Sequence, residues 1–191
     1  MYLRKAKEVL ILICSRQELY KCIQEDKNNY IENGNYFKLL LLGENKIKIY
    51  KFIKLLRYTE YHCNNKGIIH KILYLYFRRK KNYLGRKLGI EISENSFESN
   101  LTIFHAGNIV VNGSARIGKN CKLHGSNCIG NNGITYDSPV IADNVRLGVG
   151  AKVIGGVTIA ENITIAAGAI VVNSFLEPGI TIAGIPARKV K

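Results

Sequence analysis

A six-residue period governs the second half of the chain. From residue 117 to residue 171, every sixth position carries an aliphatic side chain except Thr135. The residues at these positions are Ile117, Leu123, Ile129, Ile141, Leu147, Val153, Ile159, Ile165 and Val171. A period of six fits neither the turn of an α-helix nor the alternation of a β-strand. It predicts a parallel β-helix of triangular section, in which each six-residue unit forms one side of a coil.

Residues beside the repeated aliphatic positions fit the same fold. Gly or Ala often follows the aliphatic residue, as at Gly118, Ala142 and Gly148. The residue two positions before it is usually small or apolar, as at Ala115, Cys121, Val145, Ala151, Val157, Ile163 and Ala169. We expect each aliphatic side chain to point inward and stack on its equivalent one coil later, while small residues let the backbone turn at the corners. About five coils fit between residues 95 and 183.

One segment interrupts the repeat. The sequence NNGITYDSP (131–139) covers the position where Thr135 replaces an aliphatic residue, and it is rich in turn-forming residues. We expect it to leave the coil as a protruding loop. Loops on a rigid scaffold often contact substrates, although a purely structural excursion would look the same in the sequence.

The first 90 residues follow a helical pattern. Ser15 and Glu18 have the spacing of a capping box, which predicts a helix over 16–30. Apolar residues spaced by three and four predict amphipathic helices over 44–62 and 67–89. This change of period divides the chain into a small helical region and a mainly β region.

The two regions also differ in charge. The formal net charge is +14, and residues 1–90 hold 20 of the 28 Lys and Arg residues against seven Asp and Glu. The densest cluster is RRKK (78–81). We therefore distinguish a basic helical N-terminal region (1–90) from a β-helix domain with a C-terminal tail (91–191). The charge suits an anionic cosubstrate or an anionic membrane surface, and nucleic acid is not expected because no groove-reading motif occurs.

Cysteine spacing and hydropathy indicate the cellular setting. The apolar run VLILIC (9–14) is too short for a secretory signal or a membrane span. The five cysteines have no C-x-x-C spacing, which argues against a disulfide framework and a structural zinc site. We expect a cytoplasmic protein, soluble or resting on the inner membrane face. His62 and His70, in the predicted helices, are interpreted as structural or solvated.

Three segments together resemble the hexapeptide-repeat acyltransferases. They are FHAGNIVVNG (104–113), LGVGAKVIGGVTI (147–159) and ITIAGIPARKV (180–190). The similarity is greatest to the serine acetyltransferases and to related enzymes that O-acetylate bacterial surface polysaccharides. It implies a left-handed parallel β-helix preceded by a small helical region, assembly as a homotrimer, and acetyl-CoA as cosubstrate in the groove between neighbouring β-helices.

The resemblance assigns the catalytic role to His105. The family's catalytic His lies shortly before an Ile-Val-Val run, and His105 directly precedes AGNIVV (106–111). In serine acetyltransferases an Asp within Val-Asp-Ile pairs with this His, and the matching segment GIEIS (89–93) places Glu91 there, with a spacing one residue shorter. Counting back by sixes from Ile117 also reaches residue 105, so the period predicts an inward position for His105. A polar ring there is the local exception expected at a functional site.

The same resemblance indicates residues for acetyl-CoA. Val149 and Ala167 match corner positions whose backbone meets the pantetheine arm, and Gly130 matches a glycine near the thioester. Arg188 and Lys189 in the C-terminal tail would meet the CoA phosphates. No metal is expected.

The chain departs from the serine acetyltransferases in the region that handles the acceptor. Those enzymes have an acidic residue before the catalytic His, where this chain has Phe104, and an Arg-His pair in the loop matching 131–139, which here has neither. A desolvated amino acid needs partners for both of its charges. The sequence therefore favours acetyl transfer to a hydroxyl of a sugar or surface polysaccharide precursor, with Asn132, Tyr136 and Asp137 as hydrogen-bonding residues.

Several alternatives stay open at this stage. The main one is serine O-acetylation in cysteine biosynthesis. His124 either reaches the active-site groove and binds the acceptor, or points outward without a role. A β-helical carbonic anhydrase would need three His ligands, and the β-helical region offers only His105 and His124. The last alternative is that the chain is a scaffold protein without catalytic activity. Cys121 and Cys128 occupy coil positions suited to small residues, so no acyl-enzyme intermediate is expected.

Overall fold

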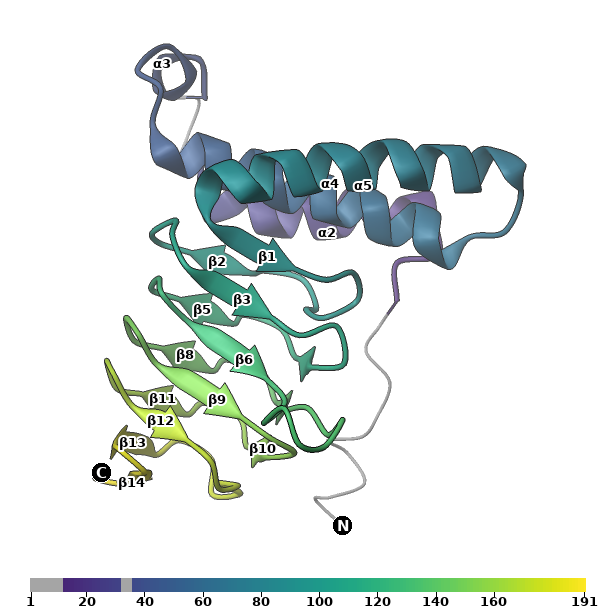
Figure 1. Ribbon diagram of the computed structural model, residues 1–191. Coiled ribbons are helices and arrows are strands. Elements are labelled where there is room, and N and C mark those ends of the chain that lie inside the picture. Colours follow the sequence, from purple (N-terminus) through teal and green to yellow (C-terminus); the bar gives the residue numbers. More distant parts are fainter. Residues whose placement is uncertain (1–11, 32–35) are drawn as a thin grey trace.

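A layer of helices covers one end of a parallel β-helix (Figure 1). The computed structural model describes residues 12–31 and 36–191. The helices are α2 (Arg16–Asn28), α3 (Tyr36–Leu41), α4 (Asn45–Asn64) and α5 (Ile68–Leu88). The helices expected from the sequence are confirmed as α2, α4 and α5, whereas the short α3 has no clear sequence signal. The apolar run predicted not to span a membrane begins at residues 9–11, which lie outside the described residues.

The capping box at the start of α2 is present in full. The Glu18 backbone N–H donates to the Ser15 hydroxyl at 3.1 Å, and the Ser15 backbone N–H donates to the Glu18 carboxylate at 2.9 Å. Hydrogen bonds from the backbone N–H groups of Cys14 and Ser15 lower the pKa of Glu18 below its ordinary value, and the bond from Cys14 has the larger effect. The helix therefore begins where the sequence indicates.

Three parallel sheets form the three sides of the β-helix. Side A contains β1 (Ile90–Ile92), β3 (Ile109–Val111), β6 (Cys128–Gly130), β9 (Lys152–Ile154) and β12 (Ile170–Val171). Side B contains β4 (Arg116–Ile117), β7 (Val140–Ile141) and β10 (Thr158–Ile159). Side C contains β2 (Thr102–Ile103), β5 (Lys122–Leu123), β8 (Arg146–Leu147), β11 (Thr164–Ile165), β13 (Thr181–Gly184) and the antiparallel β14 (Ala187–Lys189).

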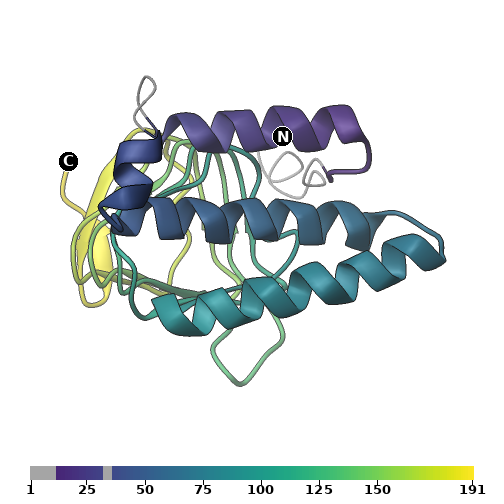
Figure 2. The ribbon, with the colours of Figure 1, turned by 90° about the horizontal axis from the view of Figure 1, so that it is seen from above.

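The six-residue period is confirmed as the inward-facing series. All nine aliphatic residues that define it are at most 2% exposed. Val153 pairs with Val171, eighteen residues later, as one full coil requires. Ile129 pairs with Val153, twenty-four residues later, because the six additional residues form the loop at 131–139. That loop protrudes from the coil (Figure 2).

The corners between sides make three edges, named here by the sides they join. Edge CA contains residues 104–108, 124–127, 148–151 and 166–169; edge AB contains residues 112–115, 131–139 and 155–157; edge BC contains residues 118–121, 142–145 and 160–163. Asn120 and Asn144 stack on edge BC with positive φ angles of 58° and 60°, a conformation that Asn tolerates better than most residues. The Asn120 side-chain amide donates to the Asn144 carbonyl oxygen at 2.8 Å, which links neighbouring coils.

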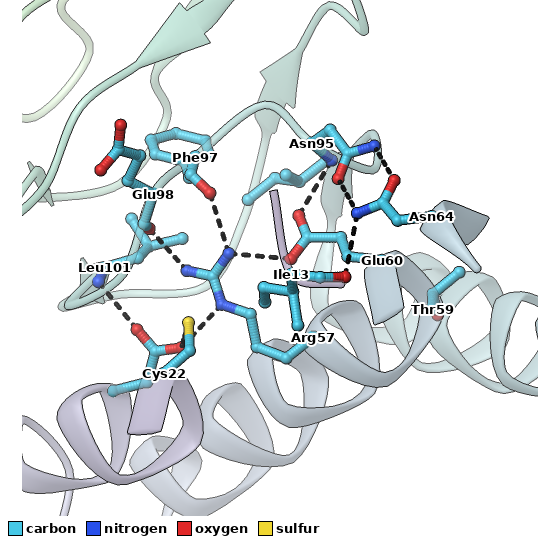
Figure 3. Close-up of polar contacts among 12 residues, drawn as sticks. Ile13, Cys22, Arg57, Thr59, Glu60, Asn64, Asn95, Phe97, Glu98 and Leu101 are labelled. Atoms are coloured by element: carbon cyan, nitrogen blue, oxygen red, sulfur yellow. Dashed lines mark hydrogen bonds and ion pairs between the residues drawn. The ribbon is translucent and has the colours of Figure 1, made fainter. Parts of the chain in front are cut away.

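Buried Arg57 on α4 joins the helices to the first coil (Figure 3). Its guanidinium donates to the Asp26 carboxylate at 2.8 Å and to the Glu60 carboxylate at 3.0 Å. It also donates to the backbone carbonyls of Phe97 at 2.9 Å and Glu98 at 2.7 Å. The first coil has no preceding coil to bond these groups, so the helices supply their partners.

Other helical side chains complete this cap on the remaining parts of the coil. The Asp26 carboxylate accepts from the Leu101 backbone N–H at 3.0 Å, and Glu60 accepts from the Asn95 backbone N–H at 2.9 Å. On side A, the ammonium of Lys81 donates to the Ile92 carbonyl at 2.8 Å. The apolar core is likewise continuous from α4 into the β-helix. Within residues 12–31 and 36–191, none of the helices has the length and apolar content that a bilayer crossing requires.

Replacing Arg57 with Met should destabilise the whole fold. The substitution keeps the apolar stem but removes the positive charge that two buried carboxylates face, and it removes the donor to two carbonyls. We expect the free energy of unfolding to fall by about 3–5 kcal/mol. Urea denaturation followed by circular dichroism measures the change.

Lys21→Met is the matched control, since Lys21 makes an exposed ion pair with Glu25 on α2. Exposed pairs contribute about 0–1 kcal/mol, so this variant should unfold close to the parent chain. Equal losses in the two variants would contradict the capping role of Arg57.

Candidate active site

His105 lies on an enlarged corner of edge CA. Ile103 pairs with Leu123, twenty residues later, whereas Val111 pairs with Ile129, eighteen residues later. The chain between Ile103 and Val111 is therefore two residues longer than the equivalent segment in the next coil. The inserted residues push the corner outward, and His105 is exposed.

The prediction that His105 occupies an inward position is wrong. The inward side chains on either side of this corner are Ile103 and Ile109, which are at most 1% exposed. Counting by sixes fails here because the corner contains two extra residues. His105 therefore lies on an irregular corner of the coil. The six-residue period does not predict its position there.

The corner beneath His105 is shaped by Gly125 and Asn127. Gly125 has a φ of +118°, and a Cβ added there would lie 3.3 Å from the Cβ of His105. Asn127 is fully buried; its side chain accepts from the Gly125 backbone N–H at 3.0 Å and donates to the Gly148 carbonyl at 2.8 Å. Gly125 and Asn127 thus fix the shape of the corner on which His105 packs.

Phe104, His124 and Arg146 form an outward-facing cluster beside His105. The rings of Phe104 and His124 stack with centroids 4.4 Å apart. The Arg146 Nε–H donates to His124 Nε2 at 2.8 Å, which leaves the His124 ring proton on Nδ1. Burial lowers the pKa of His124, and the charges of Arg146 and His105 lower it further. His124 therefore lies beside His105, and its surroundings favour the neutral form of its ring.

Arg146 is a residue that the sequence analysis missed. It lies in register with Lys122 on the neighbouring strand, so two cations stand side by side on side C. Among the described residues, neither one forms an ion pair with a carboxylate. Like charges at directly paired positions are unfavourable. The sequence carries only a weak signal for this pair, because Arg116 and Lys152 also directly precede inward aliphatic residues.

Glu91, the predicted partner of His105, points outward from β1. It pairs in register with Val110 and is exposed. In the described residues it makes no hydrogen bond to His105. It instead lines a cleft of about 480 Å³ between α5 and side A, together with Arg78 and Arg86. One chain alone therefore does not bring the predicted pair together.

Two predicted cofactor residues share edge CA with His105. Val149 is 52% exposed and Ala167 is exposed one coil below it. Backbone hydrogen bonds stack these corners, with the Gly150 N–H donating to the Gly125 carbonyl at 2.9 Å and the Gly168 N–H donating to the Val149 carbonyl at 2.8 Å. The structure thus places Val149 and Ala167 in one line along edge CA of the β-helix.

The other predicted cofactor residues lie elsewhere on the prism. Gly130 is buried at the far end of β6, toward edge AB. Arg188 and Lys189 lie on β14, next to the last parallel strand of side C. Lys189 is paired with Glu177 at 2.6 Å, whereas no ion pair involving Arg188 occurs among the described residues.

Three of the predicted acceptor residues lie on edge AB, in the loop at 131–139, whereas His124 lies on edge CA. Tyr136 is 95% exposed. The Asn132 side chain accepts from the backbone N–H groups of Ile134 and Thr135 at 3.0 and 2.9 Å, so it stabilises the loop itself. Asp137 is exposed and lies against Gly156. Within one chain, side A separates this loop from His105.

The remaining titratable groups offer little competing chemistry. Burial raises the pKa of the Cys121 thiol to about 12, which disfavours a thiolate nucleophile there. Across residues 12–31 and 36–191, no three His, Cys, Asp or Glu side chains gather as a metal site would require. His62 and His70 contact each other through Nδ1 atoms 3.0 Å apart, between α4 and α5. The exposed imidazole of His105 is therefore the group best placed for chemistry.

Sequence comparison finds proteins that are similar to this chain. No protein-family model matches the chain. A serine acetyltransferase of Staphylococcus xylosus is 33% identical over 133 residues, which cover 64% of this chain and 61% of the relative. The chain is therefore similar to serine acetyltransferases over about two thirds of its own length. The first three curated relatives match over only 61%, 46% and 38% of their own lengths.

Solved structures show the same fold. Serine acetyltransferase from Brucella abortus strain S19, in complex with coenzyme A, superimposes with a TM-score of 0.70 at 23% identity, over 92% of this chain and 68% of that one. The soybean serine acetyltransferase complexed with serine gives a TM-score of 0.72 at 20% identity, over 93% and 79% of the two chains. The predicted left-handed parallel β-helix with a small N-terminal helical region is therefore confirmed.

Gly125→Ala should impair the candidate site while preserving the β-helix. The new methyl group would press on His105 and shift its ring, and a small displacement of a reacting group is costly. We expect any activity that depends on His105 to fall by about tenfold or more. Release of CoA thiol from acetyl-CoA, in the presence of an acceptor, measures it.

Gly155→Ala is the matched control for backbone strain. Gly155 also has a positive φ, +91°, but a Cβ there would meet nothing within 4 Å. Both variants should lose about 1 kcal/mol of stability, and only Gly125→Ala should lose activity. Equal activities in the two variants would show that the space beside Gly125 does not control the position of His105.

Proposed function

We propose that the chain is an acetyl-CoA-dependent O-acetyltransferase. The observation that carries the proposal is the exposed His105 on its enlarged corner, in line with the exposed corner residues Val149 and Ala167 on edge CA. An extended pantetheine arm along this edge would bring its thioester to the imidazole. The coenzyme A complex of the Brucella abortus relative supports this assignment.

His105 acts as general base in the proposed reaction. Neutral imidazole accepts the proton of the acceptor hydroxyl as the oxygen attacks the thioester carbonyl. Backbone N–H groups near Gly130 would stabilise the tetrahedral oxyanion. Its collapse breaks the carbon–sulfur bond, and the imidazolium returns the proton to the leaving thiolate. The products are the acetyl ester and free CoA.

A homotrimer would bring the separated parts of the site together. Edge CA carries His105, whereas edge AB carries the loop with Asn132, Tyr136 and Asp137, next to Gly130 at the end of β6. Side-by-side packing of β-helices sets edge AB of one copy against edge CA of the next.

L-Serine is the acceptor that the relatives favour. The named relatives are serine acetyltransferases, and the soybean structure contains serine. The loop lacks the family's Arg-His pair, but Arg146 and His124 form an Arg-His pair on side C beside His105. The guanidinium could bind the serine carboxylate there. This arrangement weakens the main sequence argument for a sugar acceptor.

A carbohydrate hydroxyl remains the second candidate because of Phe104. Its ring stands where serine acetyltransferases have an acidic residue, and it stacks on His124. A serine ammonium group would find no carboxylate at that position, whereas the apolar face of a sugar ring packs well on an aromatic side chain. Asn132, Tyr136 and Asp137 would supply its hydrogen bonds.

Replacing His105 with Ala should abolish acetyl transfer while leaving acetyl-CoA bound. Loss of a general base lowers turnover by about 100- to 10,000-fold. Thiol release measures turnover, and calorimetric titration with CoA checks that the groove is intact. Full turnover in the variant would refute the proposed mechanism and favour a scaffold role.

Arg146→Ala should separate the two acceptors. Loss of a charged hydrogen bond to carboxylate should raise the KM for L-serine by about tenfold or more, with the KM for acetyl-CoA unchanged. Lys152→Ala is the control, since Lys152 is an exposed cation on side A. Turnover of a neutral oligosaccharide but not of serine, insensitive to Arg146→Ala, would establish the carbohydrate instead.

A further inference from the structure

The outer face of α5 carries a row of exposed apolar side chains. Ile68, Ile69, Ile72 and Leu75 are 60–71% exposed, and Tyr76 follows them at 48%. They occupy the first half of the helix, on the side opposite the residues that pack against α4. We call these five residues the α5 ridge. Exposed aliphatic side chains gathered in this way mark an interaction surface.

The second half of α5 continues the same face with basic residues. The helix contains seven Lys and Arg residues and no Asp or Glu. Two of the seven, Arg78 and Lys81, approach Glu94. Among the described residues, no ion pair is made by the other five: Lys71, Arg79, Lys80, Arg86 and Lys87.

Aromatic residues stand among these cations. The ammonium of Lys80 lies 4.4 Å from the Tyr76 ring centroid, and that of Lys87 lies 4.6 Å from the Tyr83 ring centroid. Tyrosine suits an interface between an apolar and a wet medium, since its ring is apolar and its hydroxyl is polar. The face thus joins apolar, aromatic and cationic groups along one helix.

The inner face of α5 is already satisfied by the fold. The Phe77 ring stacks on Tyr58 of α4 with centroids 4.9 Å apart, and Gly85 is buried next to β1. Figure 2 shows α2, α4 and α5 side by side over the end of the β-helix, with α5 at the rim of the layer. The ridge is therefore available at the outside of the cap.

We propose that α5 docks on the surface of an anionic lipid bilayer. The ridge would enter the boundary between headgroups and acyl chains, and the five unpaired cations would meet anionic headgroups. Charge complementarity selects this occupant. A nucleic acid backbone offers nothing to the isoleucines, and a second copy of α5 would set unpaired cations near one another. The proposal does not rest on the enzymatic activity.

Vesicle co-sedimentation of the full chain tests this docking. Vesicles of phosphatidylcholine alone are compared with vesicles of phosphatidylcholine and phosphatidylglycerol at a ratio of about 3:1, in low and high salt. We expect the anionic vesicles to bind the chain about tenfold more tightly, and salt to reduce the difference. Equal binding to both vesicle types, or to neither, would overturn the proposal.

Two double variants and one control assign the binding to α5. Ile72→Ser with Leu75→Ser removes the centre of the ridge, and Arg79→Ser with Lys80→Ser removes two cations; each should weaken binding by about tenfold. Lys122→Ser with Lys152→Ser removes the same charge from exposed positions on the β-helix and should leave binding near that of the parent.

Sedimentation velocity separates the remaining alternative. The docking proposal predicts that the ridge variant keeps the mass of the parent in solution. A ridge variant that loses mass while vesicle binding is unchanged would show that the ridge contacts a second copy, and it would refute docking. Equal weakening by the β-helix control would likewise refute a site on α5, because net charge alone would then explain binding.

Discussion

The fold depends on satisfying the open end of the first β-helix coil. A solenoid buries its backbone polar groups against the next coil, so its first coil needs partners from elsewhere. Here the partners are helical side chains: Arg57 for two carbonyls, Asp26 and Glu60 for two N–H groups, and Lys81 for a further carbonyl. The apolar core runs without a break from α4 into the coils. The helical region thus forms the end of the β-helix rather than a separate module.

Below this cap, regular stacking gives the candidate site its rigidity. Each inward aliphatic residue rests on its equivalent one coil away, and hydrogen bonds between corners hold edge CA in line. The site is an exception within that order. Two inserted residues raise His105 out of the coil, and Gly125 and Asn127 shape the corner beneath it. An irregular corner on a regular prism places one imidazole at a fixed position.

The sequence predicted the periodic parts well and the polar contacts poorly. Nine aliphatic residues at a spacing of six define the coils without any three-dimensional information, and the motif around His105 selects a His that the structure leaves exposed on an irregular corner. The phase argument for His105 failed because an insertion within the turn is invisible to a count by sixes. Arg57 was missed because its partners, from Asp26 to Phe97, are brought together only by the fold. Arg146 was missed because an exposed cation on a strand looks like ordinary surface charge.

The charge near His105 differs from the net charge of the β-helix region around it. Residues 91–191 hold eight Lys and Arg against seven Asp and Glu, so the β-helix region is nearly neutral. Even so, Lys122 and Arg146 stand together near His105, while Glu98 faces Lys119 and Glu177 faces Lys189 away from them. The field at the site is therefore positive although the region is not. A positive field disfavours a charged His124 and attracts anions. Acetyl-CoA is such an anion, and so is the carboxylate of an amino acid, whereas a neutral sugar gains nothing from this field. Phe104 favours a sugar through ring contact, whereas Arg146 favours an amino acid through the charge of its carboxylate. The two candidate acceptors thus differ in which of these two neighbours of His124 they would contact.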